Sequence, residues 1–322
     1  MAFLVGHMLN HPKSLIKRIL YKVGVYRLNG ISNRFYILPY HMVVSKVNGF
    51  FPETSTLSFE KQVAHLAKNY KVLSLDEIVT RARNRISLRR CAAITFDDGF
   101  GDNYENAYPV LKKYNVPATV FLATRCIETG AAPWFIRLRY IFMKTDRTEY
   151  ELPLKGQNGF CHMRTSTERF AASETVMTHL KTCLEQERIS LMDRLCRELG
   201  ICDFTGLNDL MLNWDQIREM SKYGISFGAH TVTHPVLSTI SMNEAEREVS
   251  ESKTVIEGKI GQPVTTFAYP FGKRRDYKRE MVATLEKLQF NCAVTTETGI
   301  NNYNTPPFEL NRFSPWELSP MG

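Results

Sequence analysis

The sequence lacks the cysteine pattern that disulfide frameworks and cysteine-based zinc sites need. Its 322 residues include seven cysteines, and no two of them stand in a Cys-x-x-Cys spacing. An odd, scattered set of thiols indicates reduced cysteines and favours the cytoplasm over an oxidising compartment. The stretch from Met1 to His7 also lacks the early positive charge and long apolar core of a signal peptide. We therefore expect a cytoplasmic protein.

Other absences narrow the class of protein further. No apolar stretch reaches the length of a transmembrane helix, and there are no internal repeats or low-complexity tracts. The net charge of +8 comes from basic residues spread along the chain. Because no recognised nucleic-acid module accompanies that charge, we expect no nucleic-acid partner.

Residues 1–30 form a separate basic segment. Within 12–26, leucine and isoleucine alternate with lysine and arginine in the pattern of a basic amphipathic helix. Two interpretations stay open: peripheral contact with an anionic membrane, or a helix packed on the main domain, residues 31–322.

The main domain alternates apolar strand candidates with capped helices. Capping-box patterns begin at Ser74, Asn213 and Ser241. The strand candidates are 36–44, 91–96, 117–123, 225–229, 264–268, 291–295 and 309–313. This alternation predicts an α/β fold, an incomplete or distorted (β/α) barrel of about seven parallel strands. Between 126 and 212 it gives way to a charge-mixed helical stretch, which we interpret as an insertion.

Two adjacent aspartates, Asp97 and Asp98, end the apolar run 91–96. Neighbouring residues on an extended backbone point in opposite directions, so one carboxylate would bind a metal while the other faces a substrate water. Asp102 then opens an amphipathic helix through about Tyr114. A helix cap with a solvated turn would explain Asp-Asp-Gly equally well, so this segment alone leaves both interpretations open.

Two histidines, His230 and His234, follow a second apolar strand. If the chain turns helically after Ala229, both imidazoles project from one face and reach one zinc ion. With Asp98 they supply three ligands, which leaves a coordination position for water, as in catalytic sites. We expect a divalent metal, Zn²⁺ in the first place, with Co²⁺ and Ni²⁺ as alternatives.

A third segment, Phe267-Ala268-Tyr269-Pro270-Phe271-Gly272, follows another strand and predicts a tight turn. In this order the three segments resemble the polysaccharide deacetylase family, also called the NodB-homology carbohydrate esterases, over 36–44, 90–123 and 216–312. The resemblance implies a barrel fold and hydrolysis of an acetamide on a carbohydrate. It implies that Asp97 is the general base, that the metal ligands are Asp98, His230 and His234, and that the N–H of Phe271 completes an oxyanion hole. We also expect Tyr269 and Pro270, at the turn, to contact the substrate.

The chain departs from the common family pattern at two places. Ala268 stands where the common form has an arginine, so the general base must be oriented differently. The common form also draws its general acid from a late Leu-x-x-His. Here Phe313 stands three residues after Leu310, in the place of that histidine, and no histidine follows His234. His41 ends the first predicted strand and resembles the Tyr-His of the poly-N-acetylglucosamine deacetylase branch. It is our candidate acid, and its alternative is a packed strand histidine.

The sequence therefore predicts a metal-dependent hydrolase that removes N-acetyl groups from a polysaccharide, an oligosaccharide or a lipid-linked sugar. The insertion would form a lid or a wall of the substrate groove, where Trp134 either stacks on a sugar ring or belongs to the core. Two alternatives remain: a metal amidohydrolase acting on a small non-sugar amide, and a non-catalytic glycan-binding relative that has lost its acid.

Overall fold

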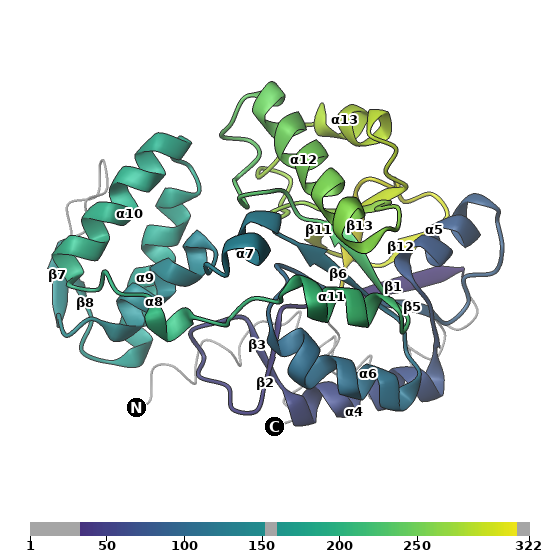
Figure 1. Cartoon of the computed structure of the whole chain (residues 1–322), viewed down its shortest axis with the longest axis horizontal. Helices are drawn as coiled ribbons and strands as arrows, with labels where there is room; N and C mark the ends of the chain where they lie inside the picture. The colour runs from purple at the N-terminus through teal and green to yellow at the C-terminus, as the bar shows by residue number, and fades with distance from the viewer. Residues whose placement is uncertain (1–32, 152–159, 314–322) are drawn as a thin grey trace, which may run out of the picture.

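A mostly parallel sheet forms the centre of the protein. The computed structural model describes residues 33–151 and 160–313, and the predicted amphipathic segment 12–26 lies outside them (Figure 1). Seven of the strands run parallel in the order β1 (Arg34–Tyr40), β5 (Cys91–Phe96), β6 (Ala118–Leu122), β9 (Ile225–Ala229), β10 (Thr266–Ala268), β11 (Cys292–Thr298) and β13 (Leu310–Arg312). The N–H of Phe313 donates to the carbonyl of Ile37 at 2.9 Å, which brings the last strand back beside the first. The predicted distorted barrel is confirmed.

Short strands extend this arrangement at its edges. β4 (Lys71–Val72) pairs parallel to β5, and β12 (Asn301–Asn302) pairs antiparallel to β1. β2 (Met42–Val44) and β3 (Glu53–Ser55) form a separate parallel pair directly after β1. β5 is buried along its whole length, as expected for a strand covered on both faces of a parallel sheet.

Helices cover the barrel, and three of them begin where the sequence predicts. They are α4 (Thr56–Asn69), α5 (Leu75–Arg83), α6 (Tyr108–Tyr114), α11 (Trp214–Ser221), α12 (Met242–Ile260) and α13 (Met281–Lys287). The side chains of Ser74, Asn213 and Ser241 each accept a backbone N–H three residues on, which confirms these caps. Helical structure follows Asp102 and ends at Tyr114 as predicted, but the Asp102 side chain makes no capping hydrogen bond. A π-helical turn, η1 (Asn103–Ala107), precedes α6, and the Asp102 carboxylate instead accepts the N–H of Val43 at 3.1 Å.

The segment predicted as an insertion forms a lobe beside the barrel, seen at the left of Figure 1. Its elements are α7 (Thr124–Thr129), α8 (Trp134–Lys144), β7 (Glu149–Glu151), β8 (Phe160–His162), α9 (Ser166–Leu180), α10 (Glu185–Leu199) and the 3₁₀ turn η2 (Thr205–Leu207). The β7–β8 hairpin was not predicted, since three-residue strands carry almost no periodic signal. On its return the chain is tied to the loop after the aspartate pair, because Leu212 donates its N–H to the carbonyl of Gly99 at 2.9 Å.

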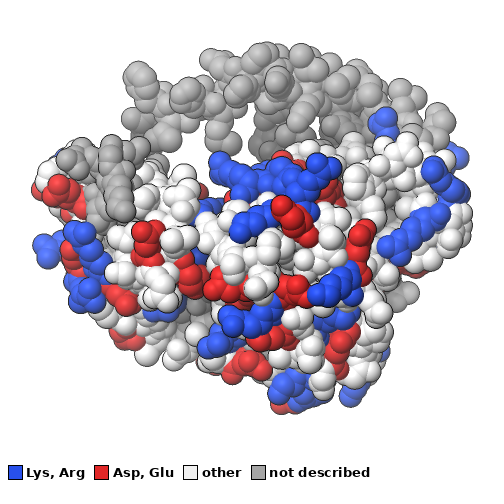
Figure 2. All heavy atoms as spheres, turned by 90° about the horizontal axis from the view of Figure 1, so that it is seen from above, with Lys and Arg blue, Asp and Glu red and all other residues white. Residues whose placement is uncertain are grey.

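The surface carries charges of both signs. On the face shown in Figure 2, lysine and arginine side chains are interspersed with aspartate and glutamate. Across the part of the chain that the structure describes, no helix has the length and apolarity to cross a bilayer.

The core between β6, β9 and β10 leaves no room for a side chain at Gly228. A Cβ atom there would lie 2.5 Å from the ring of Phe121 and 2.6 Å from the hydroxyl of Thr266. We therefore expect Gly228→Ala to lower the free energy of unfolding by about 1–3 kcal/mol. Gly258→Ala is the matched control, because its Cβ in α12 would meet open space. Helix propensity predicts about 0.5–1 kcal/mol of added stability there. Urea denaturation measures both, and equal stabilities would contradict this packing.

Candidate active site

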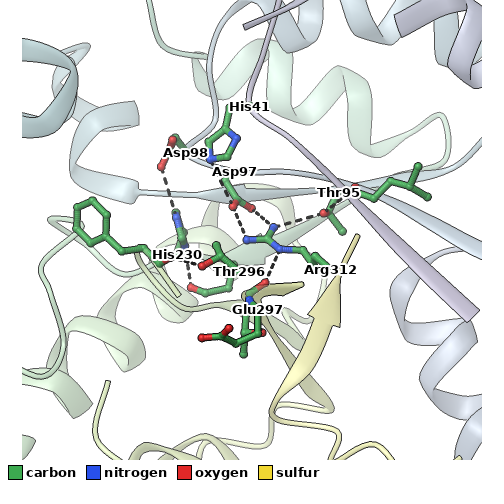
Figure 3. A network of polar contacts seen from close by, with 12 residues as sticks. His41, Thr95, Asp97, Asp98, His230, Thr296, Glu297 and Arg312 are labelled. Atoms are coloured by element: carbon green, nitrogen blue, oxygen red, sulfur yellow. Dashed lines mark hydrogen bonds and ion pairs between the residues drawn. The ribbon is translucent and has the colours of Figure 1, made fainter. Parts of the chain in front are cut away.

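The ends of several strands bring the predicted chemistry together at one edge of the barrel (Figure 3). Asp97 and Asp98 follow β5, His230 follows β9, and His41 lies between β1 and β2. Because these strands are parallel, their carboxyl ends share the rim where barrel enzymes carry their active sites. A residue that sequence reasoning did not assign, Arg312 of β13, joins them.

Asp98, His230 and His234 form a buried cluster. The Nε2 atoms of His230 and His234 lie 3.4 and 3.3 Å from Oδ1 of Asp98, and 3.2 Å from each other. The side chains of all three are at most 4% exposed, and three of their ligand atoms lie within 4.8 Å of one another. Neither carboxylate oxygen of Asp98 has a hydrogen-bond partner among the described residues, which leaves buried negative charge facing two imidazoles. This donor set fits a divalent cation.

The electrostatics of Asp98 and His234 also suit metal binding. Burial alone would raise the pKa of Asp98, but the neighbouring His230 and His234 side chains outweigh it and lower that pKa. Burial lowers the pKa of His234 to about 3. Asp98 is therefore anionic and His234 neutral near pH 7, the forms in which these side chains bind a metal.

The loop that carries the two histidines is not helical, so the predicted helical turn after Ala229 is wrong. Thr231 and His234 both adopt left-handed backbone conformations, with φ of 68° and 56°. These two reversals, rather than one helical turn, aim the imidazoles at each other. Glu248 of α12 holds the loop from behind by accepting the N–H groups of Val232 and Thr233, each at 2.8 Å.

His230 is oriented by a backbone partner. Its Nδ1 lies 2.7 Å from the carbonyl oxygen of Ala268, so its Nε2 points into the cluster. Ala268 is the position where the common family form has an arginine. Here its carbonyl, rather than its side chain, serves the site.

Arg312 forms a bidentate ion pair with Asp97. Its Nη1 and Nη2 atoms donate to Oδ1 and Oδ2 of Asp97, both at 2.7 Å, and its Nε donates to the carbonyl of Thr295 at 2.7 Å. Burial alone would raise the pKa of Asp97, but the Arg312 guanidinium outweighs it and holds this pKa well below its usual range. The carboxylate is thus kept ionised and in one orientation. The burial of both residues excludes a solvated turn at Asp97.

The arginine that orients Asp97 therefore comes from the last strand and not from the Pro270 turn. The sequence did carry a signal for it. Arg312 interrupts the otherwise strand-like run from Leu310 to Phe313, and a charged residue in a buried strand requires a partner.

His41 lies on the open side of Asp97. Its Nε2 is 3.8 Å from Oδ2 of Asp97, and its side chain is 32% exposed. The backbone at His41 is held because its carbonyl accepts a 2.7 Å hydrogen bond from the side-chain amide of Asn103. This histidine is therefore not packed inside the sheet, and its ring is accessible to a ligand.

Aromatic rings form one wall of the site. Phe271 has φ of 59°, and its ring centroid lies 4.9 Å from that of His234 and 5.5 Å from that of Trp134. Trp134 donates its Nε1–H to the carbonyl of His234 at 3.2 Å, so the insertion reaches the cluster of Asp98, His230 and His234. The ammonium of Lys181, just after α9, lies 4.0 Å above the Phe271 ring.

Tyr269 is a correction to the predicted substrate contacts. Its side chain is completely buried, and its ring stacks on Tyr277 with centroids 3.9 Å apart. Pro270 is also buried. Alternation along the strand end turns Tyr269 into the core, so its side chain does not present a surface to substrate.

Comparison with known proteins gives matches over much of the chain. A family model described as polysaccharide deacetylase matches residues 85–293. The Bacillus subtilis protein YxkH, which carries the provisional name polysaccharide deacetylase, is 24% identical over 278 residues, 86% of this chain and 69% of its own. The poly-β-1,6-N-acetyl-D-glucosamine N-deacetylase of Staphylococcus aureus is 41% identical over 71 residues, which span 22% of this chain and 24% of that protein.

Solved structures share the fold. The Streptococcus pyogenes deacetylase PplD, determined with acetate, aligns with a TM-score of 0.59 at 22% identity, covering 87% of this chain and 91% of its own. IcaB from Ammonifex degensii aligns with a TM-score of 0.53 at 18% identity, covering 88% and 92%. With the family model matching most of the chain, the protein belongs to the polysaccharide deacetylase family, enzymes that hydrolyse the N-acetyl amide bonds of polysaccharides.

Proposed function

We propose that the protein is a metal-dependent N-deacetylase of glycans that contain N-acetylglucosamine. The observation that carries the proposal is the buried Asp98, His230 and His234 cluster beside an ionised, oriented Asp97. The name of the Staphylococcus aureus relative supports the sugar. The substrates to compare are a polysaccharide, short oligosaccharides and a lipid-linked sugar.

Asp97 is the proposed general base. A divalent ion held by Asp98, His230 and His234 would supply Lewis acidity to the acetamide carbonyl and to water. Both oxygens of Asp97 accept from Arg312, yet a carboxylate offers about four lone-pair sites, so it retains capacity to accept a proton from the attacking water. Arg312 therefore makes Asp97 a weaker base, because it lowers the pKa of the carboxyl group, and at the same time fixes its orientation.

His41 is the proposed general acid, and the Phe271 N–H the proposed oxyanion donor. The amine is a poor leaving group and needs a proton as the carbon–nitrogen bond breaks, which a partly exposed imidazolium can supply. The position of His41, 3.8 Å from Asp97, favours catalysis over a non-catalytic relative that has lost its acid. A fixed backbone donor at the Phe271 turn would stabilise charge on the carbonyl oxygen.

Metal content separates the roles of the two aspartates. Asp98→Ala, His230→Ala and His234→Ala should each lose bound metal and acetate release, because each removes one of three ligands. Asp97→Asn should keep its metal and lose turnover. Exposed His65 provides the control variant His65→Ala, which should change neither quantity. Metal analysis beside acetate assays on N-acetylglucosamine oligosaccharides decides this, and metal loss in Asp97→Asn would contradict the assignment.

A general acid can be recognised by its dependence on the leaving group. His41→Ala should keep fold and metal while its turnover of an N-acetylated glycan falls about a hundredfold to ten-thousandfold. With 4-nitrophenyl acetate, whose leaving group departs without a proton, the deficit should be much smaller. If His41→Ala loses turnover equally on both substrates, or keeps full turnover of the glycan, His41 is not the general acid.

The pairing of Arg312 with Asp97 can be tested through stability. Arg312→Met leaves a buried carboxylate unpaired and should lower the free energy of unfolding by about 3–5 kcal/mol. Adding Asp97→Asn should restore most of that stability without restoring turnover, because the base is then absent. Urea denaturation of the two single variants and the double variant measures this coupling. Additive losses would show that the two side chains do not depend on each other.

A further inference from the structure

A cavity lies beside the active site, where the insertion meets the barrel. It has a volume of about 240 Å³ and is lined by parts of α7, α8 and α10 together with Thr233, the residue before His234. In Figure 1, α7 lies between the lobe of α8 to α10 and the sheet. The cavity is thus built from both parts of the protein, and none of the proposed catalytic groups lines it.

Three arginines line this cavity: Arg125, Arg137 and Arg188. Arg188 is only 3% exposed, and it donates through Nη2 to Glu185, whereas its Nη1 is buried without a partner among the described residues. The Nε of Arg137 is buried and unpartnered in the same way. A buried donor without a partner is unfavourable, so these two nitrogen atoms would be stabilised by an acceptor in the cavity.

The acidic residues of the cavity do not supply an acceptor for these arginine donors. Glu185 and Asp193 are its acidic lining residues; Glu185 already accepts from Arg188, and Asp193 is exposed. The start of α8 adds positive potential, because Pro133 and Trp134 line the cavity and the first turn has neither an acidic residue nor a side-chain cap. Unpaired N–H groups at a helix start favour an anion.

Trp134 connects the cavity to the active site. The Arg188 guanidinium lies 4.9 Å from the centroid of its ring, and its Nε1 donates to the carbonyl of the metal-ligand candidate His234. The same ring packs against Phe271 at 5.5 Å. A group bound in the cavity would therefore lie one side chain away from the site of acetamide hydrolysis.

We propose that this cavity binds an oxyanion, a phosphoryl or carboxylate group, carried by the glycan substrate. The inference rests on the proposed deacetylase function and adds to it that the enzyme prefers an anionic glycan. Guanidinium groups suit such a ligand because their planar N–H pairs match the oxygens of phosphate and carboxylate. A neutral polymer of N-acetylglucosamine would leave Nη1 of Arg188 and Nε of Arg137 without an anionic acceptor.

The experiment compares two N-acetylglucosamine oligosaccharides of equal length, one neutral and one bearing a phosphate ester. The ratio of their kcat/KM values should favour the phosphorylated glycan by about tenfold to a hundredfold, the range of one charge-assisted hydrogen bond. Arg188→Met and Arg125→Gln should reduce that ratio toward one. Arg125 is exposed, so its substitution keeps the test valid if Arg188→Met does not fold. Arg197→Gln, on the exposed surface of α10 and outside the cavity lining, should retain the ratio.

Calorimetry with inorganic phosphate separates this proposal from the function on which it rests. Weaker phosphate binding in Arg125→Gln than in the parent and in Arg197→Gln supports the cavity, even if neither glycan is deacetylated and the proposed function fails. The proposal is overturned if no variant changes the kcat/KM ratio of the two glycans and if neither Arg125→Gln nor Arg188→Met weakens phosphate binding. Acetate release from the neutral glycan would then still uphold the deacetylase.

Discussion

The burial of two adjacent carboxylates, Asp97 and Asp98, is the constraint on which the rest of the site depends. Neither charge is tolerable in the interior without compensation, and the two are compensated differently. Asp97 receives a guanidinium in bidentate geometry from Arg312, and Asp98 faces two imidazoles whose loop is fixed by Glu248. Asp98 has a left-handed backbone, with φ of 72°, so the two side chains are not separated by the alternation of an extended strand as the sequence suggested. Each carboxylate nevertheless reaches its own set of partners.

The Asp97 carboxylate needs a cation to hold it in one orientation, and in this protein that cation comes from β13. Where the common family form would place an arginine, this protein has Ala268, whose carbonyl orients His230 instead. The arginine arrives on β13, the strand that returns beside β1 and nearly closes the barrel. The ion pair therefore links β13 to the end of β5. The orientation of Asp97 thus depends on the same strand that brings the two edges of the barrel together.

The insertion contributes to the site rather than only covering it. Trp134 bonds to the His234 carbonyl, Lys181 lies over Phe271, and Arg188 lies over Trp134. Two neighbouring rings, Phe271 and Trp134, thus lie beside His234, and each is contacted by a cation. Such a wall combines flat apolar surfaces suited to sugar rings with positive charge, and it would allow the insertion to set substrate preference while the barrel retains the chemistry.

The sequence alone determined the parallel barrel, its helix caps, and the gathering of Asp97, Asp98, His230 and His41 at one rim. These follow from local pattern, because apolar runs, caps and strand ends are encoded within a few residues. The tertiary structure alone decided that Arg312 partners Asp97, that a left-handed loop aims His230 and His234, and that Tyr269 faces the core. The first two depend on contacts with residues elsewhere in the sequence, Asp97 with Arg312 and the histidine loop with Glu248. For Tyr269, the packing of the barrel decides which face of the strand end lies in the core.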